Sequence, residues 1–403
     1  MINYRNVTDD IVWIGGSDRR LHRFENLFPL PQGVSYNSYV VLDEQITLFD
    51  TADITVSDQY LENLTGLLGD RKPSYLVILH MEPDHCSQIA TVAALYPEMK
   101  LVASAQAFRM LHQFFPELEG REEITMAEGG TLQTGRHTFH FVTAPMVHWP
   151  EVLMAWDDVS KGLFCADAFG TFGATDTALW ADELDFEREY LSEARRYYAN
   201  IVGKYGVQVQ AVLKKAAGLD LAALYPLHGP LWRDAQGIGW FLDKYQKWSQ
   251  YEPEDDGYVV IYGSLYGHTE SAAQLAAAML REKSGRDVRI YDVSGTDVSE
   301  LIGEVWRCRH IVLFCPTYNN GIYPPMANFL HDCAALSVQK RVFALAQNGT
   351  WAPASGKLMT ELISGWKDCT IVEPMLTIKS ALHEADRPAL DAFVEAVIKG
   401  GNV

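Results

Sequence analysis

The chain has 403 residues, of which 48% are hydrophobic and 21% are charged, and its formal net charge is −19. This is an ordinary globular composition with room for two or three domains, and the negative charge argues against nucleic acid or an anionic membrane as the main partner. No apolar run reaches membrane-spanning length, no signal peptide is expected at the start, and the six cysteines form no CxxC pair. We therefore expect a cytoplasmic protein with reduced thiols and no built-in rubredoxin or ferredoxin module.

The first part of the chain is rich in predicted strands, beginning with residues 37–42 and 47–50. A further apolar run at 74–79 is typical of a buried strand, and it leads directly into His80-Met81-Glu82-Pro83-Asp84-His85. Helical spacing of apolar residues then predicts a helix over 87–96. Two imidazoles and two carboxylates in one turn are too many for a single tetrahedral ion with an open position. They suit half of the ligand shell of two adjacent ions.

The later predicted strands of this half share one feature, because each leads to a histidine or an aspartate. These strands are 137–142 before His148, 152–156 and 162–165 before Asp167, and, after a long helical region at 187–218, the short run 224–227 before His228. With the first turn they supply four imidazoles and three carboxylates, enough for two metal ions and one bridging carboxylate. The predicted ligands are His80, Glu82, Asp84, His85, His148, Asp167 and His228.

A polar stretch with proline and glycine at 251–257 has no periodicity, and it places a domain boundary between residues 252 and 253. Beyond it, predicted strands alternate with helices. The strands are 258–262, 288–291, 310–315, 342–345 and 370–373, and the helices are 269–282, 298–306, 324–336 and 387–399. This alternation predicts a doubly wound parallel sheet in residues 253–403.

The first strand of this second domain ends in a loop that is suited to a phosphate group. The loop combines hydroxyl groups at Ser264 and Thr269 with the amide groups of a helix N-terminus, but it contains no lysine or arginine. A monophosphate such as that of FMN fits this loop better than a nucleotide with several phosphates. The predicted binding residues here are Ser264, Leu265, Tyr266, Gly267, His268 and Thr269.

Two further loops at strand ends are expected to meet the first one at the same edge of the sheet. Each offers an aromatic ring, Tyr318 and Trp351, that could flank a flat isoalloxazine ring. The predicted binding residues in these loops are Pro316, Thr317, Tyr318, Asn319, Asn320, Gly321, Asn348, Gly349, Thr350 and Trp351.

Over essentially its whole length the chain resembles the flavodiiron proteins, also called A-type flavoproteins. The resemblance is carried by the pattern H-x-E-x-D-H at 80–85, by His148, Asp167 and His228 at strand ends, and by the second domain. It implies a metallo-β-lactamase-like αββα sandwich at 1–252 and a flavodoxin-like doubly wound parallel sheet at 253–403, the minimal two-domain class. Zinc hydrolases of this fold usually carry histidine where Glu82 stands, and a carboxylate there favours iron or manganese over zinc.

The resemblance also implies which residues hold the metals. One iron would take His80, Glu82 and His148, and Asp167 would bridge it to the other. The second iron would take Asp84, His85 and His228. By family analogy Tyr197 and Tyr198 are candidate proton donors behind the centre, and packing is the alternative role for at least one of them.

The two cofactors together predict reduction of O2 to water, of NO to N2O, or of both, in oxygen or nitric oxide detoxification. By resemblance the chain forms a head-to-tail homodimer or a dimer of dimers. A separate carrier would deliver the electrons, with rubredoxin first and a reduced deazaflavin second. Two alternatives stay open from the residues: a di-zinc hydrolase with a vestigial flavodoxin domain, and a non-catalytic flavin electron carrier. Two positions depart from the family pattern, His268 where asparagine is frequent and Gly349 where tyrosine is frequent.

Overall fold

The computed structural model describes residues 2–400, which divide into two compact units. The first unit comprises the residues up to 198 together with 205–246, and the second comprises 199–204 and the residues from 247 onward. The sequence placed the division at 252/253. In the structure the chain changes units at 246/247, and the short segment 199–204 packs with the second unit.

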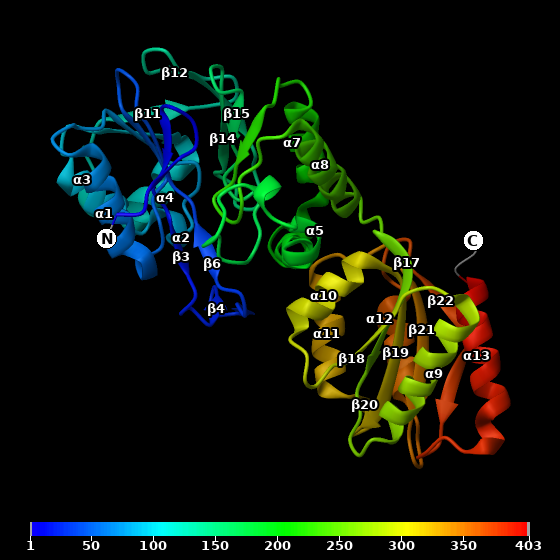
Figure 1. Ribbon diagram of the computed structural model, residues 1–403. Helices are drawn as coiled ribbons and strands as arrows, with labels where there is room; N and C mark the ends of the chain where they lie inside the picture. The colour runs from blue at the N-terminus through cyan, green and yellow to red at the C-terminus, as the bar shows by residue number, and fades with distance from the viewer. Residues whose placement is uncertain (1, 401–403) are drawn as a thin grey trace. The chain divides into compact units, whose positions relative to one another are not determined.

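Two large sheets form the centre of the first unit (Figure 1). The seven-stranded sheet has the spatial order β1 (Arg5–Asn6), β2 (Ile11–Trp13), β7 (Tyr39–Val41), β8 (Thr47–Phe49), β9 (Tyr75–Val77), β10 (Lys100–Ser104) and β11 (Glu123–Met126). The five-stranded sheet has the order β12 (Thr131–Gln133), β13 (Thr138–Thr143), β14 (Leu153–Asp157), β15 (Gly162–Phe164) and β16 (Ala223–Tyr225). Two short pairs join β3 (Gly16–Asp18) with β6 (Val34–Tyr36), and β4 (Arg23–Phe24) with β5 (Phe28–Pro29).

Aromatic side chains from both sheets fill the space between them. Phe49 of β8 stacks on Phe164 of β15 with ring centroids 4.0 Å apart, and Phe139 of β13 packs edge-on against Phe49. Burial of such rings is the main apolar contribution to a core of this kind. The packed sheets confirm the predicted sandwich.

Helices cover the sheets on their outer faces (Figure 1). Beside the first sheet lie α1 (Ser57–Leu68), α3 (Ile89–Leu95) and α4 (Ala105–Phe114), and beside the second lie α7 (Gly206–Ala216) and α8 (Ala235–Ser249). Two shorter helices, α5 (Phe186–Glu189) and α6 (Leu191–Tyr197), precede α7 in the chain. The single turn α2 (Pro83–Cys86) lies within the predicted metal-binding turn.

Three strands of the first unit deliver predicted ligands in the same way. His80, Asp167 and His228 each stand at the third position after the end of a strand, namely β9, β15 and β16. β15 and β16 are parallel neighbours, so their carboxyl ends open on the same edge of the second sheet. Loops at such an edge can converge without breaking the ladder of backbone hydrogen bonds.

The second unit contains one parallel sheet, which confirms the flavodoxin-like prediction. Its path is β18 (Val288–Asp292), β17 (Asp255–Tyr262), β19 (Cys308–Tyr318), β21 (Val342–Asn348) and β22 (Thr370–Ile378). Helices α9 (His268–Ser284) and α13 (Arg387–Gly400) lie near each other on one face of this sheet (Figure 1). The second unit also contains α10 (Val298–Arg307), α11 (Pro324–Ala335) and α12 (Ser355–Ile363). Buried alanines of α9 share a core cluster with Val260, Val312 and Phe393.

The loop expected after the third strand is partly strand itself. β19 continues to Tyr318, and Asn319 and Asn320 turn the chain with φ angles of +47° and +57° into the short return strand β20 (Gly321–Ile322). Asparagine tolerates this left-handed backbone, and paired positive φ angles are typical of tight hairpins.

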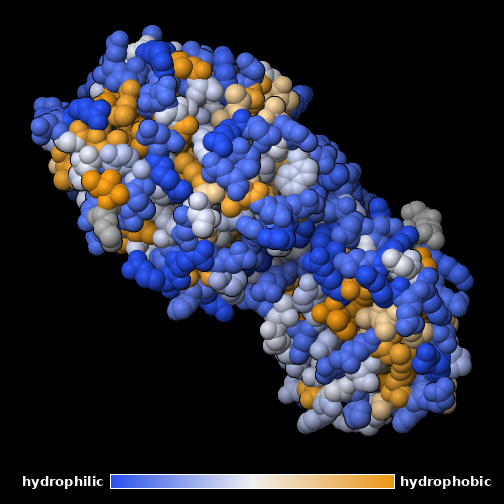
Figure 2. Space-filling model, viewed as in Figure 1, coloured by the Kyte–Doolittle hydropathy of each residue, from blue (hydrophilic) through white to orange (hydrophobic). Residues whose placement is uncertain are grey.

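The surface is mostly hydrophilic on the face that Figure 2 shows, with small hydrophobic groups between polar residues. Among residues 2–400, no helix is both long enough and apolar enough to span a bilayer.

Candidate functional site

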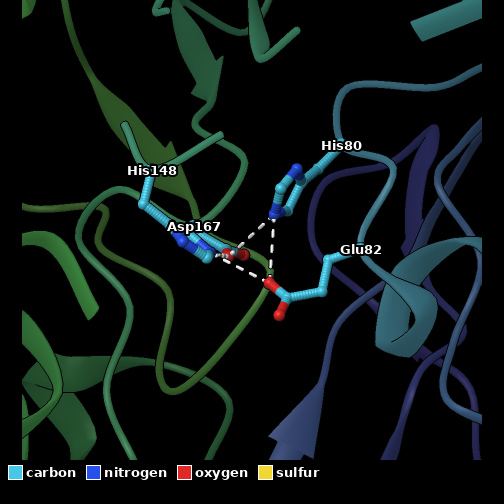
Figure 3. Close-up of side chains that lie close together, drawn as sticks. All are labelled: His80, Glu82, His148 and Asp167. Atoms are coloured by element: carbon cyan, nitrogen blue, oxygen red, sulfur yellow. Dashed lines mark hydrogen bonds and ion pairs between the residues drawn. The ribbon is translucent and has the colours of Figure 1, made fainter. Parts of the chain in front are cut away.

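The seven predicted ligands lie together in the first unit as two adjoining groups of buried side chains. His80, Glu82, His148 and Asp167 form one group, and Asp84, His85 and His228 form the other. Within each group, one ligand atom per residue lies within 4.8 Å of all the others. Figure 3 shows the first group, in which the side chains from loops far apart in sequence point toward one another.

Asp167 connects the two groups through its two oxygens. Its Oδ2 lies 3.0 Å from His148 Nε2 and 3.3 Å from His80 Nε2, whereas its Oδ1 lies 3.1 Å from His85 Nε2. A carboxylate that presents one oxygen to each group has the arrangement of a bridging ligand.

The contacts inside the groups are those of a site that fits two cations. Three buried carboxylate oxygens accept no hydrogen bond within the described chain: both oxygens of Asp84, and Oδ1 of Asp167. The Nε2 atoms of His85 and His228 face each other at 3.0 Å. Buried oxygens and imidazole nitrogens without partners are costly, and metal ions between them would remove that cost.

The pKa values show how the groups are balanced in the absence of an ion. Burial lowers the pKa of His148, but hydrogen bonds to Asp167 and Glu82 outweigh it and raise the pKa to about 9. His85 behaves alike, because the charges of Asp84 and Asp167 outweigh burial and raise its pKa to about 9. A proton on either imidazole competes with a metal ion, so metal binding would release it.

A cavity of about 560 Å³ opens in the second unit where β17, β19 and β21 end. Its lining comes from the three predicted loops and from the end of β22: Ser264, Leu265, Tyr266, His268, Thr269, Pro316, Thr317, Tyr318, Asn319, Asn320, Asn348, Gly349, Thr350, Trp351, Ala352 and Ser380. Of the predicted residues, Gly267 and Gly321 do not line the cavity, whereas Ala352 and Ser380 do so without having been predicted. The volume lies in the range of small-molecule and cofactor sites.

The cavity fits a flavin mononucleotide. Helix α9 begins at its edge, and the amide groups of a first helical turn have no partner inside the helix. The described lining contains no lysine or arginine, which suits a single phosphate. Of the two predicted rings, Trp351 is 88% exposed, whereas Tyr318 is 43% exposed and packs edge-on against Tyr323 at 6.3 Å. Both line the cavity and are open to a ligand, as is the 91% exposed Tyr266.

Both halves of the chain are similar in sequence to known protein families. The family described as ODP family beta lactamase matches residues 34–229, and Flavodoxin matches residues 260–386. The rubredoxin-oxygen oxidoreductase of Megalodesulfovibrio gigas is 28% identical over 397 residues, covering 98% of this chain and 97% of that protein. The nitric oxide reductase of Moorella thermoacetica is 26% identical over 376 residues, covering 93% and 92% of the two chains.

Solved structures agree with this match. The rubredoxin oxygen:oxidoreductase of Desulfovibrio gigas superposes with a TM-score of 0.91 at 25% identity, covering 99% of this chain and 98% of that one. The flavodiiron protein of Giardia intestinalis has the same fold, with a TM-score of 0.91 at 23% identity, covering 100% and 96%. This chain belongs to the flavodiiron proteins.

Two tyrosines of this flavodiiron chain were expected behind the metal groups, and the structure separates them. The ring of Tyr197 lies 5.6 Å from the imidazole of His228, and its buried hydroxyl has no hydrogen-bond partner among residues 2–400. Tyr198 instead packs edge-on against Tyr245 at 5.0 Å. Tyr197 therefore adjoins the metal groups, and Tyr198 has a packing contact.

Two carboxylates beside the ligands of the flavodiiron chain were not predicted. Asp50 accepts the backbone N–H groups of Leu79 and His80, and burial raises its pKa to about 7. Glu151 accepts a hydrogen bond from Nδ1 of His80 at 2.8 Å. Asp50 ends a predicted strand, which was a usable signal, whereas nothing local in the sequence pairs Glu151 with His80.

The structure explains one departure of this chain from the family pattern. A Cβ atom on Gly349 would meet the backbone Cα of Pro353 at 2.7 Å, so the turn after β21 leaves no space for a side chain there. Thr269 is tied into the same region, because its hydroxyl accepts a hydrogen bond from the amide of Asn348 at 3.1 Å.

Proposed function

We propose that this flavodiiron protein reduces O2 to water, NO to N2O, or both, at two iron ions that receive electrons from FMN. The observation that carries the proposal is the presence in one chain of a two-metal ligand set with Glu82 in the first group and of a cavity that fits FMN. The names of the relatives, an oxygen oxidoreductase and a nitric oxide reductase, support both substrates.

The ligand assignment follows the two groups of side chains. His80, Glu82 and His148 hold the first iron, and Asp84, His85 and His228 hold the second. Asp167 bridges them, since its oxygens face opposite groups.

When bound, the iron ions and FMN supply the electrons, four for reduction of O2 to two waters and two for coupling of two NO to N2O and water. The protein supplies position and protons. The Tyr197 hydroxyl is free to donate a hydrogen bond toward a small diatomic beside His228. Phe24 and Tyr36, with ring centroids 5.3 Å and 5.6 Å from that of His228, help to exclude water.

In the second unit, Ser264, Thr269 and the first amide groups of α9 would hold the phosphate of FMN. Tyr318 and Trp351 contact the isoalloxazine ring, and the other residues of the three predicted loops complete the site. The domains expected at 1–252 and 253–403 carry the metal groups and the flavin cavity, and the chain forms a head-to-tail homodimer or a dimer of dimers. The six cysteines are free thiols, which supports a reducing, cytoplasmic location.

The electron donor is a separate carrier, with rubredoxin first and a reduced deazaflavin second. No dinucleotide fingerprint or CxxC pair occurs in the sequence, so NADH alone should reduce the flavin slowly. Stopped-flow reduction with NADH alone, and with NADH, rubredoxin and its reductase, tests this. Rapid reduction by NADH alone would rule out the need for a carrier.

The decisive experiment is anaerobic reduction of the purified protein, followed by parallel measurements of O2 and NO consumption. The expected result is turnover with at least one gas, about two iron ions per chain, and FMN on acid release. Zinc without flavin absorbance would favour a di-zinc hydrolase instead. Full turnover after Asp167→Ala would favour an electron carrier in which the metal groups take no part.

A further inference from the structure

Glu151 is a buried carboxylate directly behind the first metal group. It stands three residues after His148, and its side chain is completely buried. One oxygen, Oε1, accepts hydrogen bonds from His80 Nδ1 at 2.8 Å and from the backbone N–H of Met81 at 2.9 Å. The other oxygen has no partner in the described part of the chain.

The backbone around Glu151 is held rigidly. Its carbonyl accepts a hydrogen bond from the hydroxyl of Ser104, the residue that also caps α4. Two residues on, the N–H of Leu153 donates to the carbonyl of Leu79, next to His80. The carboxylate is therefore fixed against the imidazole by contacts on both sides of the sandwich.

The two metal positions have the same kinds of direct ligand. Each group offers two imidazoles and one carboxylate of its own, and Asp167 presents one oxygen to each. The groups that lie behind the ligands are then a source of difference between the positions.

Those supporting groups are unequal. His80 Nδ1 contacts the carboxylate of Glu151, whereas His228 Nδ1 donates to the backbone carbonyl of Ser35 at 2.8 Å. His85 Nδ1 is buried and has no hydrogen-bond partner among residues 2–400. The other buried carboxylate near the ligands, Asp50, acts on His85 only through its charge, because it accepts the backbone N–H groups of Leu79 and His80. A carboxylate behind a ligating imidazole fixes its tautomer and makes it a stronger donor, and such partners typically change metal affinity about 10- to 100-fold. The added negative charge also favours the more highly charged state of a nearby ion in a buried site.

We propose that Glu151 is a positioning residue that makes the two metal positions unequal. It makes the position of His80, Glu82 and His148 bind its ion more tightly and lose its electron more easily than the position of Asp84, His85 and His228. The inference rests on the proposed function only in taking iron as the metal. It predicts which of the two positions binds iron more tightly and is oxidised first.

The test measures each position alone. His228→Ala disables the second position and His148→Ala disables the first, and each is combined with Glu151→Gln, which keeps the hydrogen-bond acceptor but removes the charge. The full-length, FMN-loaded protein is stripped of metal with a chelator and titrated anaerobically with Fe2+. We expect Glu151→Gln to weaken binding about 10- to 100-fold at the first position, and less than about 2-fold at the second.

A redox measurement gives an independent result. The diferrous protein with both positions intact is oxidised by one equivalent of ferricyanide, which takes one electron per chain and becomes ferrocyanide. In Glu151→Gln this first oxidation should occur at a higher potential and leave a different electron paramagnetic resonance signal, whereas Glu151→Asp should retain the wild-type order of the positions.

Asp157→Asn is the matched control, because Asp157 is a buried carboxylate 2.9 Å from His137 Nδ1, away from both metal groups. Equal weakening at both positions, the same effect from Asp157→Asn, or no change in affinity and potential would each overturn the proposal. Unequal, Glu151-dependent binding in a protein that consumes neither gas would disprove the function and leave the inference standing. If the protein reduces either gas and Glu151→Gln changes neither iron affinity, the proposed function stands and the inference is wrong.

Discussion

The metal groups and the flavin cavity differ in how deeply their residues are buried and in how many sheets contribute to them. The seven metal ligands are at most 8% exposed and come from loops spread between residues 80 and 228, on both sheets of the sandwich. The cavity is formed by loops of one sheet, and its aromatic rings at positions 266 and 351 lie almost wholly in solvent.

This difference has a physical consequence. The metal groups are part of the core, so their geometry is set when the two sheets pack and a missing ligand leaves a buried group unpaired. The cavity wall contributes little to the core, so substitutions there should change flavin affinity in graded steps. The predictions below test that distinction.

The largest effect is expected for His228→Ala, which removes an imidazole from the second metal group. Iron should fall from about two to about one per chain and gas reduction should be lost, while FMN stays bound because the cavity lies in the other unit. Iron and flavin analysis with O2 and NO assays checks this. His140→Ala, at a histidine outside both groups, is the control and should keep both ions. Full activity in His228→Ala would contradict the assignment of the second iron.

A smaller and purely flavin-specific effect is expected for Thr269→Phe. The bulky ring replaces a buried hydroxyl that is bonded to Asn348 at the start of α9. Losing such a polar contact costs about 1 to 3 kcal/mol, so FMN retention should fall about 5- to 150-fold with iron unchanged. Fluorescence titration of released FMN measures it.

The exposed residue Ser271, on the same helix, provides the control for that variant. Ser271→Phe should leave FMN affinity within about 2-fold of wild type, because the side chain points away from the core. Parallel loss of iron in Thr269→Phe would show that the two sites are not independent.

A weaker effect is expected for Trp351→Ala at the cavity mouth. An aromatic contact with a flat ring contributes about 0.5 to 1.5 kcal/mol, so FMN should bind about 2- to 10-fold more weakly. Since the side chain is 88% exposed, the free energy of unfolding of the flavin-free protein should not change. Urea unfolding without FMN tests the second point, and a large destabilisation there would mean that Trp351 packs against the protein.

The smallest effect concerns a buried histidine outside the metal groups. Burial lowers the pKa of His137, but hydrogen bonds to Asp157 and Asp10 outweigh it and raise the pKa from 6.5 to about 9. The protonated form is thus stabilised by folding. This contribution is complete below pH 6.5 and is lost as the pH rises through 9, by about 1 to 3 kcal/mol.

Urea unfolding at pH 6 and pH 9.5 measures that loss. Asp157→Asn removes one of the two carboxylates that contact His137, so the fall in stability between these pH values should become smaller than in the wild type. An unchanged pH dependence in Asp157→Asn would show that His137 does not cause it.

Much of this architecture could be predicted because its signals are local. The turn from His80 to His85 follows an apolar run, and Asp167 and His228 follow others, so strand-end chemistry was visible without the fold. The same holds for the loop at Ser264 and Thr269, where hydroxyl groups precede a helix with an alternating pattern of strands behind it.

Local pattern failed where the backbone decides which way a residue faces. Gly267 turns the chain with a φ of +88° and Gly321 begins β20, so neither lines the cavity, whereas Ser380 reaches it from the end of β22. Tyr197 and Tyr198 are neighbours in sequence, yet only Tyr197 adjoins His228, because successive residues of a helix point in different directions.

The two fold classes, the kinds of ligand and the strand ends that carry them can be read from the amino-acid sequence, since they follow from periodicity and composition over short stretches. Only the tertiary structure decided that Asp167 presents one oxygen to each metal group and that Glu151 lies behind His80, 71 residues away. Such contacts arise when the two sheets pack face to face. No short-range pattern encodes them, because the partners are brought together by the burial of other residues.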